Sequence, residues 1–267
     1  VSAEQDRNAQ AIRIYTSAHV ETTCKDSEPG PRYTARLSLS GGPPSASGGQ
    51  RRMAAVTRRI AFRDVAINAG QTLWNGRPVH FRGVLDWGWN PERVAPHFFD
   101  DRDRFARARA LGFNLWKLCL YVPPESFFDA ADEAGLPVWL EMPLWLPQVT
   151  PALKALALRE YAAVLRRLHH HPCLALLSLG CELNAQADAE FLRALHDLAR
   201  AWLPNTLLCD NSGSAEAYGG VEAALSDFYD YHFYTDPHFF APLAQHFRRA
   251  HRPDKPWIYG EFCDADT

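Results

Sequence analysis

From about residue 79 onward, short apolar segments alternate with longer segments in which apolar residues recur every three or four positions. The short segments have the length of buried strands, and the longer ones have the period of amphipathic helices. Because this alternation is typical of βαβ units, we expect an α/β fold with a parallel sheet. Helices are predicted at 101–111, 124–134, 151–169, 187–202 and 238–250, and strands begin near Val79, Phe113, Pro137, Leu174, Thr206, Asp227 and Pro256.

The seven predicted strands favour a (β/α)8 barrel of the TIM type over a doubly wound sheet. A doubly wound sheet normally carries a glycine-rich phosphate turn after its first strand, and residues 84–89 contain no such turn. A closed barrel has eight strands, and the sequence ends six residues after Glu261, in the seventh unit. We therefore expect a barrel that lacks its eighth strand. Because the chain begins with Val1 rather than Met, we also expect it to be a piece of a longer product.

The first 66 residues have a different pattern. Strand-like segments at 11–15 and 33–39 are separated by polar, proline- and glycine-rich sequence, which indicates part of a β-sandwich. Residues 40–52 have the composition of a flexible linker. A strand is predicted at 60–67, and Asn75-Gly76 predicts a hairpin turn. We expect two domains, a partial β-sandwich with its linker at 1–66 and the barrel at 67–267.

Composition and charge narrow the classes of partner. The chain has 47% hydrophobic and 22% charged residues, as an ordinary globular protein has. Its formal charge of −3 and scattered arginines argue against a nucleic-acid partner. No apolar run is long enough to cross a membrane, and the N-terminal residues do not resemble a signal peptide. We therefore expect neither a nucleic-acid nor a membrane partner.

The six cysteines are widely spaced and include no CxxC pair that would indicate a zinc or redox site. Apolar neighbours, as around Cys119 and Cys209, favour buried, reduced thiols. Reduced thiols in turn favour a reducing compartment such as the cytoplasm.

Two predicted strands lead into a glutamate, Glu182 after residues 174–181 and Glu261 after residues 257–260. In a parallel barrel, working groups lie at the carboxyl ends of the strands, so both side chains are expected to reach one pocket. Two carboxyl groups about 5 to 5.5 Å apart cleave glycosidic bonds with retention, one as acid and one as nucleophile. A single strand-end glutamate is as often part of a structural ion pair, so the pair carries the prediction of catalysis.

Three segments, 75–84 (NGRPVHFRGV), 170–182 (HHPCLALLSLGCE) and 255–262 (KPWIYGEF), resemble glycoside hydrolase family 2 in sequence, order and spacing. That family includes β-galactosidases, β-mannosidases and β-glucuronidases. The resemblance implies an immunoglobulin-like β-sandwich joined to a catalytic (β/α)8 barrel. It also implies a retaining β-glycosidase that acts on a carbohydrate by double displacement without a cofactor. By the same resemblance Glu182 is the acid/base and Glu261 the nucleophile.

Cys181 departs from the family pattern. The acid/base glutamate usually follows an asparagine whose amide binds the sugar 2-hydroxyl, and a thiol is a poor hydrogen-bond donor. Either the substrate differs or the activity is reduced. A carbohydrate-binding barrel without turnover is therefore an alternative, and a transglycosidase would use the same two glutamates.

Further positions are expected to line the pocket. The resemblance places Tyr234 beside the nucleophile, where its hydroxyl would hold Glu261 ionised and oriented. Strand alternation sends His232 to the same side, as a sugar contact or equally well as a core histidine. The other expected sugar contacts lie near strand ends, and they are Asp86, Trp87, Lys117, Glu141, Trp145 and Cys181. The family commonly has an arginine near Lys117, whose ammonium cannot reproduce the arginine fork.

His169, His170 and His171 follow one another at a predicted helix end. Three adjacent histidines point in different directions and cannot all bind one metal ion. A solvated helix terminus is the preferred interpretation, and we predict no metal site.

Overall fold

The structure is a computed structural model. It describes residues 2–6, 11–15, 32–40, 52–88, 101–183, 188–213, 225–250 and 255–262.

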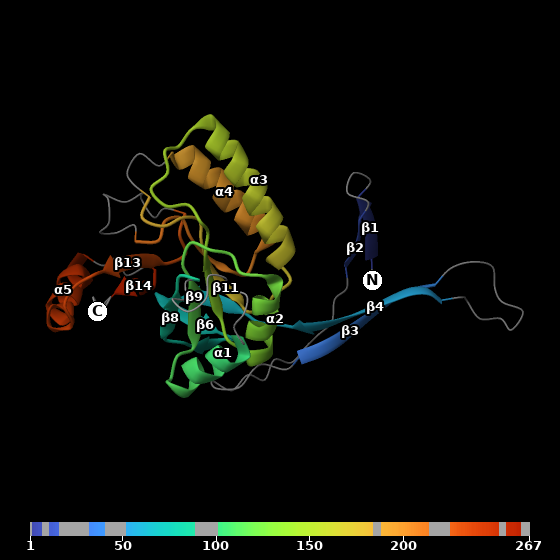
Figure 1. The fold of residues 1–267 in the computed structure, drawn as a ribbon, viewed down its shortest axis with the longest axis horizontal. Coiled ribbons are helices and arrows are strands. Elements are labelled where there is room, and N and C mark those ends of the chain that lie inside the picture. Colours follow the sequence, from blue (N-terminus) through green and yellow to red (C-terminus); the bar gives the residue numbers. More distant parts are fainter. Residues whose placement is uncertain are drawn as a thin grey trace, which may run out of the picture.

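Parallel strands that follow one another along the chain form the centre of the molecule (Figure 1). Five of them pair in the order β12-β11-β10-β9-β8, and β13 pairs in parallel with β14. The Asp227 N–H donates to the Leu208 carbonyl at 2.8 Å, which joins β12 to the segment before β13. The bounds are β8 Gly83–Asp86, β9 Leu115–Leu118, β10 Val138–Glu141, β11 Leu174–Ser178, β12 Leu207–Cys209, β13 Tyr229–Phe233 and β14 Trp257–Phe262.

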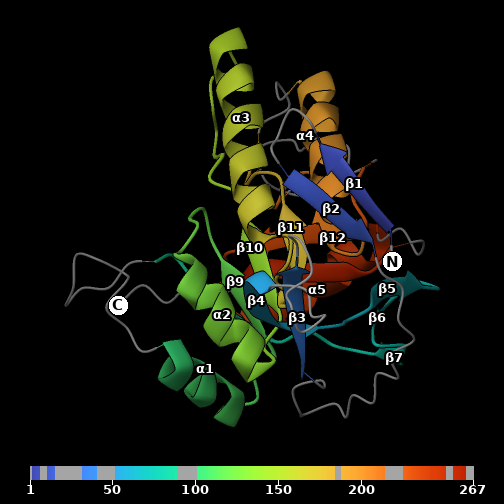
Figure 2. The ribbon, with the colours of Figure 1, turned by 90° about the vertical axis from the view of Figure 1, so that its right-hand side faces the viewer.

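Helices alternate with these strands. The Thr150 side chain caps α3 by accepting from the Leu153 N–H, and Asp188 caps α4 in the same way. Gly135 ends α2 with a positive φ of 63°. Figure 2 shows α3 and α4 side by side. The bounds are α1 Asp101–Ala110, α2 Glu125–Ala134, α3 Pro151–Leu168, α4 Ala189–Trp202 and α5 Pro237–Ala250.

The predicted α/β fold with a parallel sheet and alternating helices is confirmed. Each helix terminus lies within two residues of its predicted position. The barrel that lacks its eighth strand stays a prediction. None of the helices in the described ranges has the length and apolar character that crossing a bilayer requires.

The two faces of the sheet are covered differently. On one face, α1 to α4 contribute Phe105, Phe128, Leu165 and Leu195 to a core that also contains Leu140 of β10. Successive strand residues point to opposite faces, so the neighbouring Trp139 joins a separate cluster with Leu176, Phe228 and Val65. In the described part of the chain, no helix contributes to that second cluster. Side chains at the strand ends on this second face of the sheet are therefore available to form a site.

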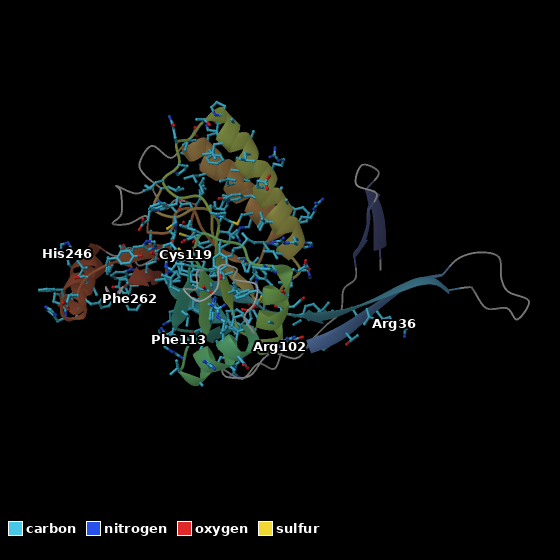
Figure 3. The ribbon with its side chains drawn as sticks, viewed as in Figure 1. Arg36, Arg102, Phe113, Cys119, His246 and Phe262 are labelled. Carbon is cyan, nitrogen blue, oxygen red and sulfur yellow. The ribbon has the colours of Figure 1, made fainter. Side chains whose placement is uncertain are left out.

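The N-terminal strands form three separate antiparallel sheets, and the pair β3–β4 projects from the body (Figure 1). Arg36 lies on this pair, whereas Cys119 lies within the body (Figure 3). The partial β-sandwich and the domain boundary stay predictions, and most of the predicted linker at 40–52 lies outside the described residues. The bounds are β1 Ser2–Asp6, β2 Ala11–Tyr15, β3 Arg32–Ser40, β4 Arg52–Ala61, β5 Val65–Asn68, β6 Gln71–Trp74 and β7 Arg77–Pro78.

The prediction of one strand at 60–67 is wrong, because β4 ends at Ala61 and β5 begins at Val65. Between them the Arg63 guanidinium donates to the Pro172 carbonyl at 2.8 Å and to Thr206 Oγ1 at 2.7 Å. These contacts anchor the segment to the residues that precede β11 and β12. The predicted Asn-Gly turn is confirmed, with φ of 50° at Asn75 and 76° at Gly76.

Candidate active site

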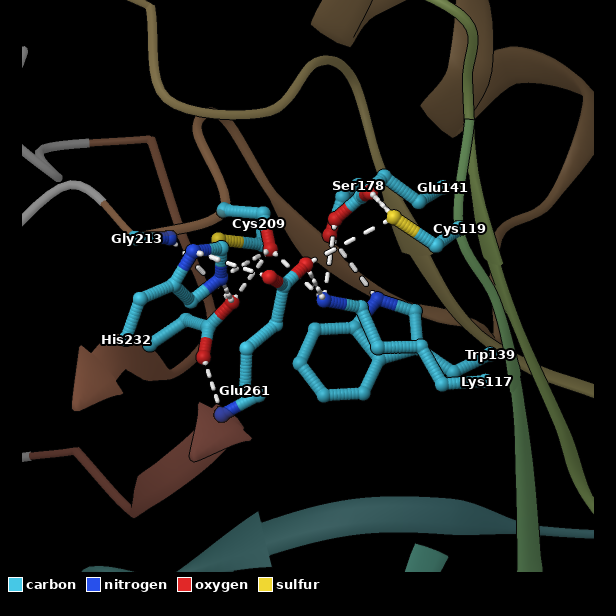
Figure 4. Close-up of polar contacts among 12 residues, drawn as sticks. Lys117, Cys119, Trp139, Glu141, Ser178, Cys209, Gly213, His232 and Glu261 are labelled. Atoms are coloured by element: carbon cyan, nitrogen blue, oxygen red, sulfur yellow. Dashed lines mark hydrogen bonds and ion pairs between the residues drawn. The ribbon is translucent and has the colours of Figure 1, made fainter. Parts of the chain in front are cut away.

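Polar side chains from six strands meet at the carboxyl ends of the parallel strands (Figure 4). Each lies on a strand or within four residues of its end, because the carboxyl ends of parallel strands lie at one edge. They are Lys117 and Cys119 from β9, Glu141 from β10, Cys181 and Glu182 after β11, Ser212 after β12, Asp230, His232 and Tyr234 from β13, and Glu261 from β14.

Lys117 is the cationic centre of the site. Its ammonium lies 3.0 Å from Glu141 Oε2 and 3.1 Å from Glu261 Oε1, and it donates to Ser212 Oγ at 3.2 Å. Burial by itself would lower the pKa of Lys117, but Glu141, Asp230 and Glu261 raise it well above its ordinary value. The buried ammonium therefore stays charged and compensates neighbouring carboxylates.

Glu261 is held from two sides. Lys117 contacts Oε1, while the Tyr234 hydroxyl donates to Oε2. Glu261 is 3% exposed, whereas Tyr234 is 51% exposed, so the pair links the buried interior to the surface. Burial and the adjacent Glu261 raise the pKa of Tyr234, which keeps its hydroxyl a donor.

Glu182 lies in a turn four residues beyond β11, so the prediction that the strand itself ends on this glutamate is wrong. Its φ of 47° is in the left-handed region, where a residue with a side chain is strained. His232 Nδ1 lies 3.0 Å from Oε1, and Trp145 Nε1 donates to Oε2 at 3.1 Å. The hydrogen bond from His232 is the main cause that lowers the pKa of Glu182, and the bond from Trp145 adds to it.

His232 connects the two glutamates. Its Nδ1 lies 3.0 Å from Glu182 Oε1 and 3.7 Å from Glu261 Oε2, while Nε2 lies 3.5 Å from Asp230 Oδ2. Burial acts to lower the pKa of His232, but hydrogen bonds to Asp230 and Glu182 raise it to about 10. A Cβ on Gly213 would lie 2.7 Å from the imidazole, so only glycine leaves room for this ring.

Cys181 turns inward and contacts the Cys119 thiol. That contact, followed by burial, raises the pKa of Cys181. For Cys119, the contact with Cys181 acts to lower the pKa of the thiol. Burial and the nearby carboxylates of Glu141 and Glu261 outweigh this contact and raise the pKa of Cys119 to about 11. The Cys119 thiol donates to Glu141 Oε1 at 3.0 Å. Both thiols are therefore neutral near pH 7.

Asp86 is predicted to contact sugar, but it lies in a different set of contacts. Its Oδ2 accepts from Arg104 at 2.7 Å, Trp116 Nε1 at 3.0 Å and the Tyr121 hydroxyl at 2.9 Å. These donors connect β8 to α1 and β9. Trp87, the residue after Asp86, is 52% exposed. Of the predicted site residues, Lys117, Glu141, Trp145, Cys181, Glu182, His232, Tyr234 and Glu261 come together, and Asp86 and Trp87 have no contact with them among the described interactions.

Three residues of the cluster were not predicted as site residues. Asp230 has the same strand alternation as His232 and Tyr234, so its spacing contained the signal. It accepts from the Gly260 N–H at 2.7 Å and from Ser212 Oγ at 2.5 Å. Cys119 lies two residues after Lys117, so strand alternation sends both side chains to the same face, but Cys119 lies one residue beyond the end of β9 and the signal is weaker. Ser212 lies in a loop and has no periodic signal.

Glu141, Cys181, His232 and Glu261 offer atoms within 4.8 Å of one another, which is a possible metal-ligand set. Lys117 already neutralises two of these groups. A metal ion at this place would compete with a buried ammonium and with the charged His232 ring.

No protein-family model matches the chain. A β-galactosidase from Arthrobacter sp. strain B7 is 30% identical over 162 residues, which cover 54% of this chain and 16% of that enzyme. An exo-β-D-glucosaminidase from Streptomyces avermitilis is 27% identical over 198 residues, which cover 66% of this chain and 21% of that enzyme. The chain is homologous to part of the glycoside hydrolase family 2 enzymes.

A solved β-glucuronidase structure has a similar fold. The β-glucuronidase of Bifidobacterium dentium, solved with coumarin-3-O-glucuronide, superimposes with a TM-score of 0.74 and 19% sequence identity. The superposition covers 86% of this chain and 40% of the β-glucuronidase chain. The matched region spans about a fifth or less of the curated family 2 relatives, at 16%, 19% and 21% of their lengths.

Proposed function

We propose that this chain carries the active site of a retaining β-glycosidase, with Glu261 as nucleophile and Glu182 as acid/base. The homology to family 2 glycosidases supports a carbohydrate substrate. The observation that carries the assignment is that one nitrogen of His232 lies within 3.7 Å of an oxygen of each glutamate. Both carboxyl groups can therefore act on one glycosidic bond.

In the first step, Glu261 attacks the anomeric carbon while Glu182 protonates the leaving oxygen. The C–O bond to the leaving group breaks, and a covalent glycosyl ester forms on Glu261. The hydrogen bond from Tyr234 and the ion pair with Lys117 orient Glu261 for this attack. The departing alcohol takes the proton of Glu182.

In the second step, Glu182 is the base that takes a proton from water, and the water oxygen displaces Glu261 from the anomeric carbon. The lowered pKa of Glu182 suits this step, since the residue must then be ionised. The acid step needs a proton on Glu182, and the lowered pKa makes that proton available only toward acidic pH. His232 is thus a positioning residue that sets the protonation of the acid/base.

A second candidate function is carbohydrate binding without turnover. The lowered pKa of Glu182 favours it, because an ionised carboxylate is a poor general acid. Cys181 favours it as well, because its thiol faces Cys119 and the family's asparagine is absent.

A panel of nitrophenyl β-glycosides would separate the two functions, with product stereochemistry followed by NMR. The proposal expects hydrolysis of at least one glycoside with the β-anomer formed first. Sugar binding without hydrolysis by the folded protein would support the second function instead, and an α-anomer formed first would contradict a retaining enzyme.

A further inference from the structure

Glu125, His170 and His171 lie together where α2 meets the segment between α3 and β11. Glu125 Oε1 lies 3.5 Å from His170 Nε2 and 3.9 Å from His171 Nε2. All three atoms lie within 4.8 Å of one another. One carboxylate oxygen and two imidazole nitrogens therefore face a common point.

His171 is the buried member of this group, with 1% of its side chain exposed. Its Nδ1 lies 2.7 Å from Asp132 Oδ2, so the carboxylate fixes the ring with the proton on Nδ1. The other nitrogen, Nε2, is buried and has no hydrogen-bond partner among the described residues. A buried acceptor without a partner destabilises the folded state, so a ligand on this lone pair would be favourable.

We propose that Glu125, His170 and His171 bind one divalent transition-metal ion of the Zn²⁺ type. Two imidazoles with one carboxylate form a ligand set that zinc uses when it keeps an open position. Ligand atoms about 2.1 Å from a tetrahedral ion lie about 3.4 Å from each other. Glu125 and His170 are about half exposed, so their side chains can close the remaining gap to the fixed Nε2.

The local fold explains why these groups converge. Residues 125 and 132 are seven apart on α2 and therefore share one face, on which Asp132 holds His171 and Glu125 faces its free nitrogen. The histidines follow the C-terminal end of α3, whose partial negative charge favours a cation. Asp132 takes the position of the carboxylate that commonly orients a metal-bound imidazole.

The third histidine of the run is turned elsewhere. His169 Nδ1 lies 2.8 Å from the Arg166 carbonyl, and its ring packs 5.1 Å from that of Trp202. Only two of the three adjacent histidines therefore face Glu125. This arrangement is compatible with the expectation that all three cannot bind one metal ion. His169 is the matched control for His170.

The metal site lies before β11, whereas Glu182 follows the same strand. A metal ion here would connect α2 to the α3–β11 segment and stabilise the fold away from the glutamates. The proposal is therefore independent of the proposed glycosidase function.

Calorimetric titration of the purified chain with ZnCl2 tests the site. We expect one Zn²⁺ per chain, and His170→Ala and Glu125→Gln should each weaken binding about tenfold or more. His169→Ala should bind as the unchanged protein does. Because residues 125 and 170 are half exposed, both variants are expected to fold, which circular dichroism would verify. Zn²⁺ should also raise the Tm of the unchanged chain and of His169→Ala. The rise in Tm should be much smaller for His170→Ala.

The proposal would be overturned if the unchanged chain bound no Zn²⁺, or if His170→Ala bound it with unchanged affinity. Cys181→Ala provides a further check, since it removes the thiol of the ligand set that contains Glu141, His232 and Glu261. Loss of the single bound ion in Cys181→Ala would place the metal near Glu261 and would equally overturn the proposal.

Discussion

Asp86 and Glu261 both lie at the carboxyl end of a parallel strand, and both are buried, but their surroundings differ. Asp86 accepts from the Gly88 N–H and from three side chains, and these donors connect β8 to α1 and β9. Glu261 is contacted by Lys117 and by Tyr234, which is 51% exposed. A carboxylate surrounded by structural donors stabilises the fold, whereas one with an exposed partner can exchange that partner for a ligand.

The neighbours differ in charge as well. The Glu261 cluster contains two buried cations, Lys117 and His232, whose raised pKa values keep them charged near neutral pH. Asp86 is paired with Arg104, whose side chain is 31% exposed. Strand-end position alone therefore does not distinguish Asp86 from the proposed nucleophile Glu261, whereas the charges around the two carboxylates do.

The sharpest test of this contrast is to remove each carboxylate in turn. Glu261→Gln should lower kcat by about 10³-fold or more, because no nucleophile remains. Asp86→Asn should lower stability more than activity, since its partners are structural. Steady-state hydrolysis of an activated aryl glycoside, with urea unfolding in parallel, checks both variants. Equal losses of kcat in the two would break the comparison.

Glu182→Gln should lower kcat by about 10²–10⁴-fold, the usual contribution of general acid–base catalysis. The loss should be smaller for glycosides with good leaving groups, because these need less protonation. Comparing dinitrophenyl with alkyl glycosides measures this dependence. A loss independent of the leaving group would remove Glu182 from the acid role.

Lys117→Met should lower the free energy of unfolding by about 3–5 kcal/mol, because it leaves buried Glu141 and Glu261 without their cation. Arg104→Met removes a partly exposed partner of Asp86, so it should lower the free energy of unfolding by only about 1 kcal/mol. Urea denaturation of both variants gives the two values. A larger loss for Arg104→Met would contradict the contrast in charge.

His232→Gln should change the pH dependence of stability. The folded-state pKa of about 10 exceeds the unfolded value near 6.5, so the stabilisation is complete below about pH 6.5 and is lost as pH rises through 10. In His232→Gln, stability should not show this decrease between about pH 6.5 and pH 10. Thermal unfolding of both proteins across that pH range measures the difference. The alkaline limb of kcat/KM should also move to higher pH, since the main cause that lowers the pKa of Glu182 is removed. An unmoved limb would separate His232 from the acid/base.

Cys181→Asn is expected to have the smallest effect, a gain in kcat/KM of up to about tenfold, equivalent to one hydrogen bond to the sugar 2-hydroxyl. The matched control is a 2-deoxy glycoside, for which the gain should vanish. The same gain with both substrates would show that the introduced amide acts through packing rather than through the hydroxyl.

Periodicity predicts the helices and most strands well, because the amphipathic patterns of α2 to α5 extend over ten or more residues. It fails at residues 62–64, where Arg63 leaves the strand to bond carbonyls more than a hundred residues away. Such long-range contacts leave no trace in local pattern.

The candidate site is predictable to a similar degree. Spacing and family motifs indicate the residues around Glu182 and Glu261, but they also include Asp86, whose partners Arg104 and Tyr121 come from α1 and the segment after β9. The inward turn of Cys181 toward Cys119 depends on packing between two strands that are not neighbours in the sheet. Neither the partners of Asp86 nor the orientation of Cys181 is encoded by the residues adjacent to them in sequence.

The most direct test of the central claim is covalent labelling with a 2-fluoro glycoside that the chain hydrolyses slowly, followed by peptide mass spectrometry. The account predicts a single glycosyl ester on Glu261, absent in Glu261→Gln. A label on another residue, or hydrolysis of β-glycosides with no covalent label, would contradict it.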